Sequence, residues 1–420
     1  MISEKKKNAV YWFLIFASFF VWVIMMGSKN VYVAEIEVIM GAFNVTEKAK
    51  ANLAMTYYFI TYAAVQILLF FILNKLNIKW FMLVSIGLSG IVTVIIGFAT
   101  AMWQLWWILA LNGILQAGVW ACCMAVLKKY LPIKFIPVAN TILNMGTAVA
   151  GVISYGTPAL FVNAGRWDLP FIILGIILSV SAVLFFLAVT MAAKLPKEER
   201  IAQNNAVSSE TKAEQPIFDL ASDKRKALFF ILTFVMSLLI HALFYGVMNW
   251  MPSLLIDKNV FALSPSAGIL ITVLAPIVTS VGPIIAVVNC EKHKNFVSVA
   301  FVYLSISLVF ALLLALFCKT NLILSILLLI VFLSVVQCAV TVVLSIVSFK
   351  MSKFINVGAH GGLMNAAGAI AAGFTPTIIG AVIDGSGWNI SYWVIFALNL
   401  ALVSIIAVML LLMKKSKKKA

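Results

Sequence analysis

Charged side chains are scarce in this chain of 420 residues, because Asp, Glu, Lys and Arg together make up only 10% of it. Hydrophobic residues make up 64%, and the mean hydropathy is +1.10. A water-soluble domain needs a polar surface and cannot bury this much apolar material in one core. The composition therefore excludes an ordinary soluble protein and indicates that lipid is the main solvent.

Residues that commonly act in catalysis or bind metals are also few. The chain has three His and five Cys, with no CxxC pair or His-linked spacing that would hold a metal. It also lacks a Gly-rich phosphate loop followed by Lys-Ser/Thr. We therefore predict that the protein is not an enzyme and uses neither a metal nor a cofactor. We interpret the cysteines as reduced packing residues.

Long apolar runs dominate the sequence instead. About 20 apolar residues let a helix cross a bilayer, and each run must be helical because lipid offers no partner to an unpaired backbone. The sequence predicts an all-α membrane protein of twelve transmembrane helices in two pseudo-symmetric six-helix bundles. The expected spans lie near residues 9–33, 53–73, 81–99, 105–127, 138–162, 171–193, 227–255, 269–288, 297–316, 322–349, 362–383 and 392–413.

A polar segment divides these spans into two sets of six. Residues 194–226 hold seven basic and six acidic side chains and almost no apolar periodicity, which is typical of a cytoplasmic linker. We therefore predict an N-terminal bundle over residues 1–193 and a C-terminal bundle over residues 227–420. Transporters are commonly built from two such repeated halves.

The two halves also echo each other in sequence. Gln116 precedes Trp167 by 51 residues in the first half, and Gln337 precedes Trp388 by the same number in the second. A Thr-Pro pair lies between them in each case. This match supports duplication. It places Gln116 and Gln337 on equivalent fourth helices, where we expect both to face a shared cavity.

The net charge of +16 is unevenly distributed along the chain. If the N-terminus is cytoplasmic, 24 of the 30 Lys and Arg residues fall on the cytoplasmic side, and the exceptions are Lys29, Lys48, Lys50, Arg166, Lys258 and Lys319. This bias predicts a multi-pass protein of the cell membrane with both termini in the cytoplasm. We expect the C-terminal lysines to touch anionic lipid headgroups. We expect no nucleic-acid partner and a monomeric state.

Lys29 is the clearest functional candidate, because the first span can continue past it without another charge. A charge inside a span costs roughly 2.5 to 3.5 kcal/mol and usually faces a cavity. Helical spacing places Trp22 and Tyr32 on the same side. The alternative is that Lys29 lies at the outer membrane edge and extends to water. Glu35 and Glu37 follow, and we expect both to begin the outer loop.

His241 lies in the middle of the seventh span, with Tyr245 and Asn249 on the same face one and two turns later. Histidine titrates near neutral pH, so His241 is a candidate for coupling transport to protons. The alternative is a buried neutral ring that satisfies a hydrogen bond.

Four spans carry uncharged polar residues at helical spacing. One stripe alone is explained by hydrogen bonds between helices, but four together favour a polar pathway. The stripes are Tyr58, Tyr62 and Gln66; Asn112 and Gln116; Asn140, Asn144 and Thr147; and Ser334, Gln337, Thr341 and Ser345. The predicted substrate-binding residues are Trp22, Lys29, Tyr32, Tyr58, Tyr62, Gln66, Gln116, Asn144, Thr147, His241, Tyr245, Asn249, Gln337 and Asn365.

Five segments carry a family resemblance. They are SKN at 28–30, GILQAGVW at 113–120, NMGTAVAG at 144–151, YGVMNWMPSLL at 245–255 and GLMNAAGAIAAGF at 362–374. They resemble the major facilitator superfamily and, within it, the organophosphate:phosphate antiporter family. The resemblance implies two halves that rock about a site at the membrane midplane, where basic side chains hold anionic substrates.

Lys29 is the one basic site residue of that family that this chain matches. Ser28 and Phe244 stand where family members have arginines, and Thr147 stands where they have a histidine. Two guanidinium groups hold a phosphate dianion through paired contacts that a single ammonium cannot reproduce. We therefore expect a carboxylate, or another small solute with one negative charge, rather than a phosphate ester.

The leading hypothesis is a secondary transporter of a small organic anion that works by antiport or proton symport. One alternative is an exporter of an amphipathic compound, for which the Met- and Trp-rich first helix is suited. Another is a non-transporting membrane sensor derived from a carrier, although the linker and tails are short for a signalling domain.

Overall fold

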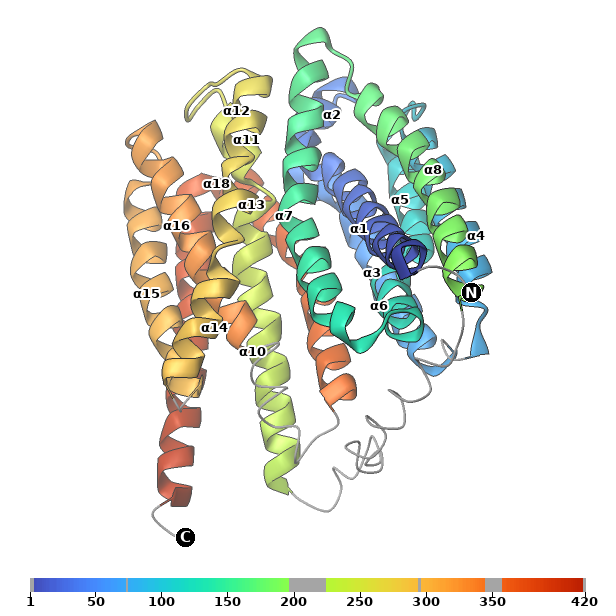
Figure 1. Ribbon diagram of the computed structural model, residues 1–420. Coiled ribbons are helices and arrows are strands. Elements are labelled where there is room, and N and C mark those ends of the chain that lie inside the picture. Colours follow the sequence, from blue (N-terminus) through green and yellow to red (C-terminus); the bar gives the residue numbers. More distant parts are fainter. Residues whose placement is uncertain (1–3, 73–74, 196–223, 294–295, 344–356, 418–420) are drawn as a thin grey trace. The chain divides into compact units, whose positions relative to one another are not determined.

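The computed structural model describes residues 4–72, 75–195, 224–293, 296–343 and 357–417 (Figure 1). Eleven helices among them are long and apolar enough to cross a membrane. The last of these, Met364–Val408, has 45 residues, which is enough for two crossings at about 20 residues each. The predicted all-α membrane fold is confirmed, and the helix count agrees with twelve spans.

The first half follows the predicted spans with small shifts at their ends. Its fourth span consists of two helices, because the chain turns at Ala117 and Gly118. The helices are α1 (Glu4–Ala34), α2 (Ile36–Ala42), α3 (Lys48–Ile72), α4 (Ile78–Ile96), α5 (Met102–Gln116), α6 (Val119–Tyr130), η2 (Ile133–Phe135), α7 (Ile136–Phe161), η3 (Val162–Ala164) and α8 (Asp168–Ala193). Residues 196–223, most of the predicted linker, lie outside the described residues, so the linker and the two predicted bundles stay predictions.

The second half has more interruptions within its spans. Its helices are α10 (Lys224–Met248), α11 (Met251–Ile256), α12 (Pro265–Thr272), α13 (Leu274–Thr279), α14 (Gly282–Lys292), α15 (Phe296–Phe317), α16 (Leu322–Thr341) and α18 (Val357–Lys417). Pro276 and Pro283 explain the division of the eighth span into α12, α13 and α14. Each proline lacks an N–H, and its ring crowds the carbonyl four residues earlier, where the preceding helix ends.

The two last predicted spans form the long helix α18. Gly387 interrupts it with φ 80 and ψ 176, a backbone conformation that side chains with a Cβ rarely adopt. The interruption falls between the predicted end at residue 383 and the predicted start at residue 392. A glycine therefore supplies the turn between these two crossings.

The chain forms two compact units. Unit 1 comprises Met1–Ile39 and Tyr57–Glu214, and unit 2 comprises Met40–Thr56 and Gln215–Ala420. The first turns of α3 thus belong to unit 2, where they pack against α18. Thr56 Oγ1 donates to Gly373 O (2.7 Å) and Asn52 Nδ2 donates to Thr377 Oγ1 (2.9 Å). The backbone therefore passes between the units within α2 and again within α3.

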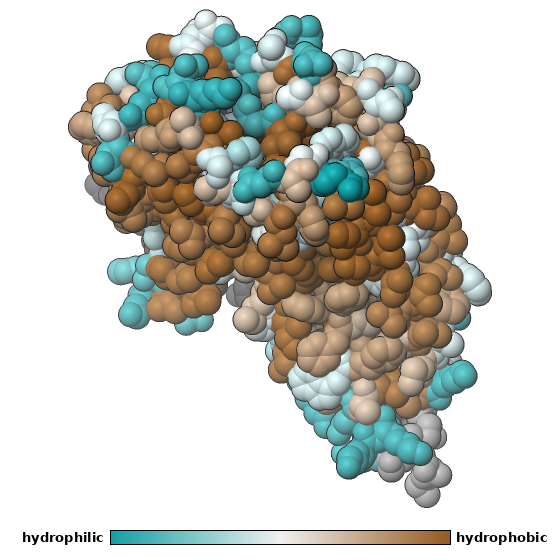
Figure 2. Space-filling model, turned by 90° about the horizontal axis from the view of Figure 1, so that it is seen from above, coloured by the Kyte–Doolittle hydropathy of each residue, from teal (hydrophilic) through white to brown (hydrophobic). Residues whose placement is uncertain are grey.

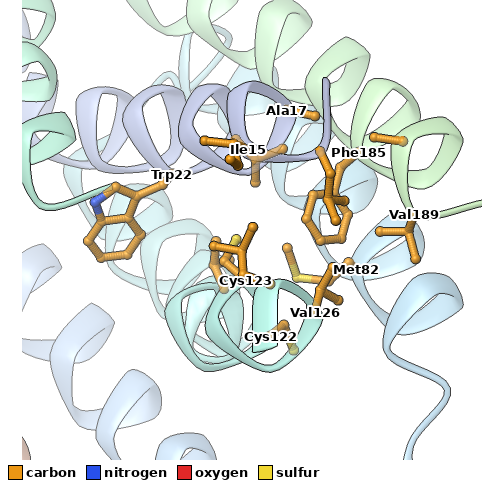
Figure 3. Close-up of a cluster of buried hydrophobic side chains, with 14 of the residues drawn as sticks. Ile15, Ala17, Trp22, Met82, Cys122, Cys123, Val126, Phe185 and Val189 are labelled. Atoms are coloured by element: carbon orange, nitrogen blue, oxygen red, sulfur yellow. The ribbon is translucent and has the colours of Figure 1, made fainter. Parts of the chain in front are cut away.

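The core of unit 1 is built where α1, α4, α6 and α8 meet (Figure 3). Its labelled side chains are Ile15, Ala17 and Trp22 on α1, Met82 on α4, Cys122, Cys123 and Val126 on α6, and Phe185 and Val189 on α8. All five cysteines of the chain are free and buried. This agrees with their interpretation as packing residues.

Large hydrophobic side chains also cover the outside of the helices. Trp80, Phe98 and Trp103 are each more than half exposed, and Figure 2 shows hydrophobic residues over most of the visible face, with hydrophilic residues gathered in separate groups. Soluble monomers rarely expose apolar patches of this extent. The surface therefore fits contact with lipid.

Candidate functional site

Lys29 lies in the C-terminal part of α1, and only 8% of its side chain is exposed. Its Nζ atom lies 3.5 Å from Met26 Sδ, 5.9 Å from the centre of the Tyr58 ring and 5.2 Å from the centre of the Phe59 ring. No described carboxylate forms an ion pair with it. Aromatic faces attract a cation but leave its charge in place. The burial argues against a lysine that extends to water.

A hydrogen-bonded network behind Tyr58 joins α3, α4 and α5. Tyr58 Oη donates to Gln116 Oε1 (2.8 Å), and Gln116 Nε2 donates to Ser89 Oγ (2.9 Å) and Asn112 Oδ1 (3.2 Å). Asn112 Nδ2 in turn donates to Thr93 Oγ1 (3.0 Å). Gln116 is 0% exposed. Contrary to the expectation from the repeat, Gln116 does not open onto a cavity but fixes the orientation of Tyr58 in unit 1.

The next turns of α3 extend the polar surface beyond Tyr58. The Tyr58 and Tyr62 rings are stacked, with centres 5.8 Å apart and planes at 21°. Gln66 Nε2 donates to Tyr62 Oη (3.3 Å). We call Lys29, Tyr58, Phe59, Tyr62, Gln66 and Gln116 the lysine cluster. The structure thus brings together five of the predicted site residues, and their role in binding a substrate stays a prediction.

Four other candidates of unit 1 lie outside the lysine cluster. Trp22 packs on Trp120 with ring centres 4.7 Å apart, and its indole N–H is buried without an acceptor among the described residues. Tyr32 Oη lies 3.5 Å from Met102 Sδ at the start of α5. Asn144 and Thr147 are exposed on α7, and Asn144 Nδ2 donates to the carbonyl oxygen four residues earlier.

In unit 2, His241 is held by its own helix and by α18. Its Nδ1 lies 2.8 Å from Ser237 O, and because a carbonyl can only accept, Nδ1 must carry a hydrogen. A Cβ built on Gly368 of α18 would lie 2.9 Å from His241 Nε2. The ring also stacks on Tyr245, with centres 6.1 Å apart and planes at 17°. The Nδ1 side of the imidazole thus forms a hydrogen bond with the backbone, and the Nε2 side packs closely against α18.

The remaining candidates of unit 2 are dispersed over three helices. Asn249 is buried just after α10, Gln337 is half-buried on α16 and Asn365 is exposed on α18. None of them belongs to the stacked pair of His241 and Tyr245. Their assignment to a substrate site stays a prediction.

An apolar hollow of about 310 Å³ lies between α4 and α5. Its wall consists of Ile95, Phe98, Ala99, Trp103, Gln104, Trp107 and Ile108. None of the predicted site residues lines it, and most of its wall is the exposed apolar surface that faces lipid. It therefore carries no weight as a substrate site.

The position of Glu35 in the structure differs from the one that the sequence predicts. The sequence places Glu35 at the beginning of the outer loop, but its side chain is 0% exposed and neither carboxylate oxygen has a hydrogen-bond partner among the described residues. That expectation is wrong because the helical path continues from α1 into α2 and carries Glu35 into the protein. The apolar residues that follow it, from Ile36 to Ala42 with Glu37 as the exception, are a signal that the helix does not end there.

Comparison with known proteins places this helical architecture in a family. The family model described as Major Facilitator Superfamily matches residues 11–301. The chain belongs to the Major Facilitator Superfamily. The resemblance to the superfamily is thereby confirmed, and superfamily membership points to a transporter of small solutes rather than an enzyme. No curated protein matches the chain.

Solved structures of other superfamily proteins have a similar fold. The nucleoside transporter NupG is 16% identical over 96% of this chain and 99% of its own, with a TM-score of 0.70. A point mutant of NupG is 12% identical over 94% and 99% of the two chains, also with a TM-score of 0.70. A bacterial homologue of the human lysosomal transporter Spinster, inward-facing and occupied, is 14% identical over 94% and 95%, with a TM-score of 0.74. At these identities the likeness shows the superfamily fold alone.

Proposed function

We propose that this superfamily member is a secondary active transporter that moves a small organic anion across the cell membrane by alternating access, with both termini in the cytoplasm. The observation that carries the proposal is the ammonium group of Lys29, which is buried with no carboxylate partner among the described residues. A buried cation is costly unless an anion pairs with it. A substrate anion would supply the missing charge.

Two positions that carry arginine in the antiporters that the sequence resembles are uncharged in this chain, which favours a substrate with a single negative charge. One is Ser28, whose Oγ donates to Met25 O (2.9 Å), so its hydroxyl is occupied by its own helix. The other is Phe244 in unit 2, whose aromatic ring contacts that of Tyr245. With one ammonium in place of several cations, a carboxylate is better matched than a phosphate ester.

Export of an amphipathic or neutral compound is the second candidate function. It is favoured by the buried indole N–H of Trp22, which lacks an acceptor among the described residues, and by the adjacent ring of Trp120. A ligand with an aromatic face and a hydrogen-bond acceptor would satisfy both groups. NupG, whose fold is similar, is a nucleoside transporter, so a nucleoside is a suitable neutral probe.

A ligand screen followed by transport separates these functions. Purified protein is heated with gluconate, a carboxylate with one negative charge, with glycerol 3-phosphate or with uridine, since a true ligand raises the unfolding midpoint by mass action. Probes that stabilise it are then tested for counterflow in preloaded proteoliposomes. We expect stabilisation and counterflow with gluconate. Counterflow with uridine alone would support the second function, and stabilisation without counterflow would support a sensor.

Lys79 offers a matched control for the role of Lys29. Its ammonium also lies over two rings, Trp80 at 5.5 Å and Phe186 at 4.6 Å, but it is only half-buried near the start of α4. Lys29→Gln should abolish gluconate counterflow, whereas Lys79→Gln should leave it close to wild type. Retained gluconate transport in Lys29→Gln would remove Lys29 from the site.

A further inference from the structure

Glu35 is a buried acidic residue that is not part of the proposed binding site. Its backbone N–H donates to Val31 O (3.0 Å), and its carbonyl accepts from the N–H of Ile39 (2.9 Å), so the helical path is continuous through this residue. Although it follows the last residue of α1, Glu35 is 0% exposed. Both carboxylate oxygens lack a hydrogen-bond donor among the described residues.

No cation among the described residues compensates a negative charge at this position. Lys29, the nearest basic residue on α1, lies over Tyr58 and Phe59 and forms no ion pair. Just before α8, Arg166 is engaged by Asp168, with Nε donating to Oδ1 (2.9 Å) and Nη2 donating to Oδ2 (2.7 Å). Asp168 itself acts on Glu35 as a like charge.

The other helices packed against α1 bring no further charge to Glu35 within the described part of the chain. On α7 the buried titratable side chain is Tyr155, which is neutral near pH 7. The lysines of α6 lie in its last turn, whereas α6 meets α1 near Ser18 and Trp22. An isolated buried carboxylate is far more costly than the neutral acid. The described surroundings therefore suit a carboxyl group that holds its proton.

The position of Glu35 in the chain connects it to movement between the units. It lies five residues before Met40, where the backbone leaves unit 1 for unit 2. This α1–α2 segment is one of the places where the backbone joins the two units covalently. We therefore expect it to take part in a rearrangement of the units.

We propose that Glu35 is a proton-binding site, which holds a proton while it is buried and releases it to water when the α1–α2 segment rearranges. Release breaks the carboxyl O–H bond, and the proton passes to a water molecule and leaves a carboxylate. The use of this proton to drive anion transport rests on the function proposed above. Proton binding by Glu35 does not rest on it.

Infrared spectroscopy of the purified full-length protein tests proton binding without a substrate. The C=O stretch of a protonated carboxyl group is separate from that of a carboxylate. We expect the band of the protonated carboxyl group in wild type at neutral pH and expect it to be lost in Glu35→Gln. The control variant Glu37→Gln, whose residue is half-buried, should retain the band. Absence of the band from wild type, or its persistence in Glu35→Gln, would overturn the proposal.

The pH dependence of stability gives a second measurement. Glu35 lies just beyond the span Glu4–Ala34, and burial raises its pKa well above the ordinary value, with Asp168 acting in the same direction. An acid whose pKa is higher in the folded state than in the unfolded state makes its full contribution to stability at pH values below the unfolded-state pKa of about 4.3. That contribution is lost as the pH rises through the folded-state pKa. Glutamine does not ionise, so the free energy of unfolding of Glu35→Gln does not show this loss.

The unfolding midpoint of wild type should therefore fall relative to that of Glu35→Gln as pH rises from about 5 to about 9, a range above the unfolded-state pKa. Glu37→Gln should follow wild type throughout. Parallel curves for wild type and Glu35→Gln would contradict proton binding at Glu35.

Gluconate in proteoliposomes then tests the coupling. We expect Glu35→Gln to retain counterflow but to lose accumulation driven by an imposed pH gradient. Accumulation equal to wild type would reject the coupling role. If gluconate is not transported at all, the transport function fails, and the infrared and stability measurements still decide whether Glu35 binds a proton.

Discussion

Gln116 and Gln337 occupy matching places in the two halves of the sequence, yet their surroundings differ. Gln116 is fully buried and joins Tyr58, Ser89 and Asn112 through three hydrogen bonds. Gln337 is half-buried on α16, and its side chain forms no hydrogen bond with a described residue. Equivalent positions in a repeat therefore do not carry equivalent roles. Unit 1 uses its glutamine to order an aromatic ring beside a buried cation.

The basic candidates of the two units differ in the same way. Lys29 is a cation that its described neighbours do not neutralise, whereas His241 is held by a backbone carbonyl and by close packing with Gly368. The proposed anion-binding chemistry is thus concentrated in unit 1.

The largest expected effect is on anion binding. Lys29→Gln removes the charge and should weaken gluconate binding on the order of 10- to 100-fold, as expected when a charge-assisted hydrogen bond of about 1.5 to 3 kcal/mol is lost. His241→Asn should change the dissociation constant by less than about threefold, because the ring is engaged within unit 2. Binding is measured by thermal shift across gluconate concentrations. An equal loss in both variants would place the substrate at both residues.

The next effect concerns the stability of the two glutamine positions. Gln116→Leu removes the acceptor of the Tyr58 hydroxyl and the donor to Ser89 and Asn112, and it should lower the free energy of unfolding by about 1 to 3 kcal/mol. Gln337→Leu should change it by less than about 0.5 kcal/mol. Chemical unfolding in detergent micelles measures both. Equal costs would mean that the asymmetry between the halves has no energetic consequence.

The smallest effect separates a tight helix contact from an open one. Gly368→Ala places a methyl group 2.9 Å from His241 Nε2, and such overpacking should cost about 1 to 2 kcal/mol of unfolding free energy. Gly156 on α7 has no atom within 4 Å of a built Cβ, so Gly156→Ala should be neutral or stabilising by up to about 1 kcal/mol. Unfolding in micelles compares the two. No loss in Gly368→Ala would show that His241 can move away.

Much of the fold could be predicted from the sequence, but the details of the site could not. The predicted span 171–193 agrees within a few residues with the observed α8 (Asp168–Ala193), because length and hydropathy are local properties. The grouping of Tyr58, Tyr62 and Gln66 on one face of α3 could also be predicted from the sequence, because the three residues follow helical spacing. The sequence misplaces Glu35 because the helix continues beyond the apolar run that marks the first span.

The amino-acid sequence alone determined that this protein is helical and lies in lipid, because a bilayer accepts only apolar segments that satisfy their own backbone hydrogen bonds. Only the tertiary structure decided which buried polar groups have partners. Tyr58 and Gln116 are 58 residues apart, and Gln116 and Ser89 are 27 apart. Whether a side chain finds a partner depends on such distant neighbours. The absence of a carboxylate beside Lys29, and of a hydrogen-bond donor to Glu35, among the described residues therefore emerges only once the helices are packed.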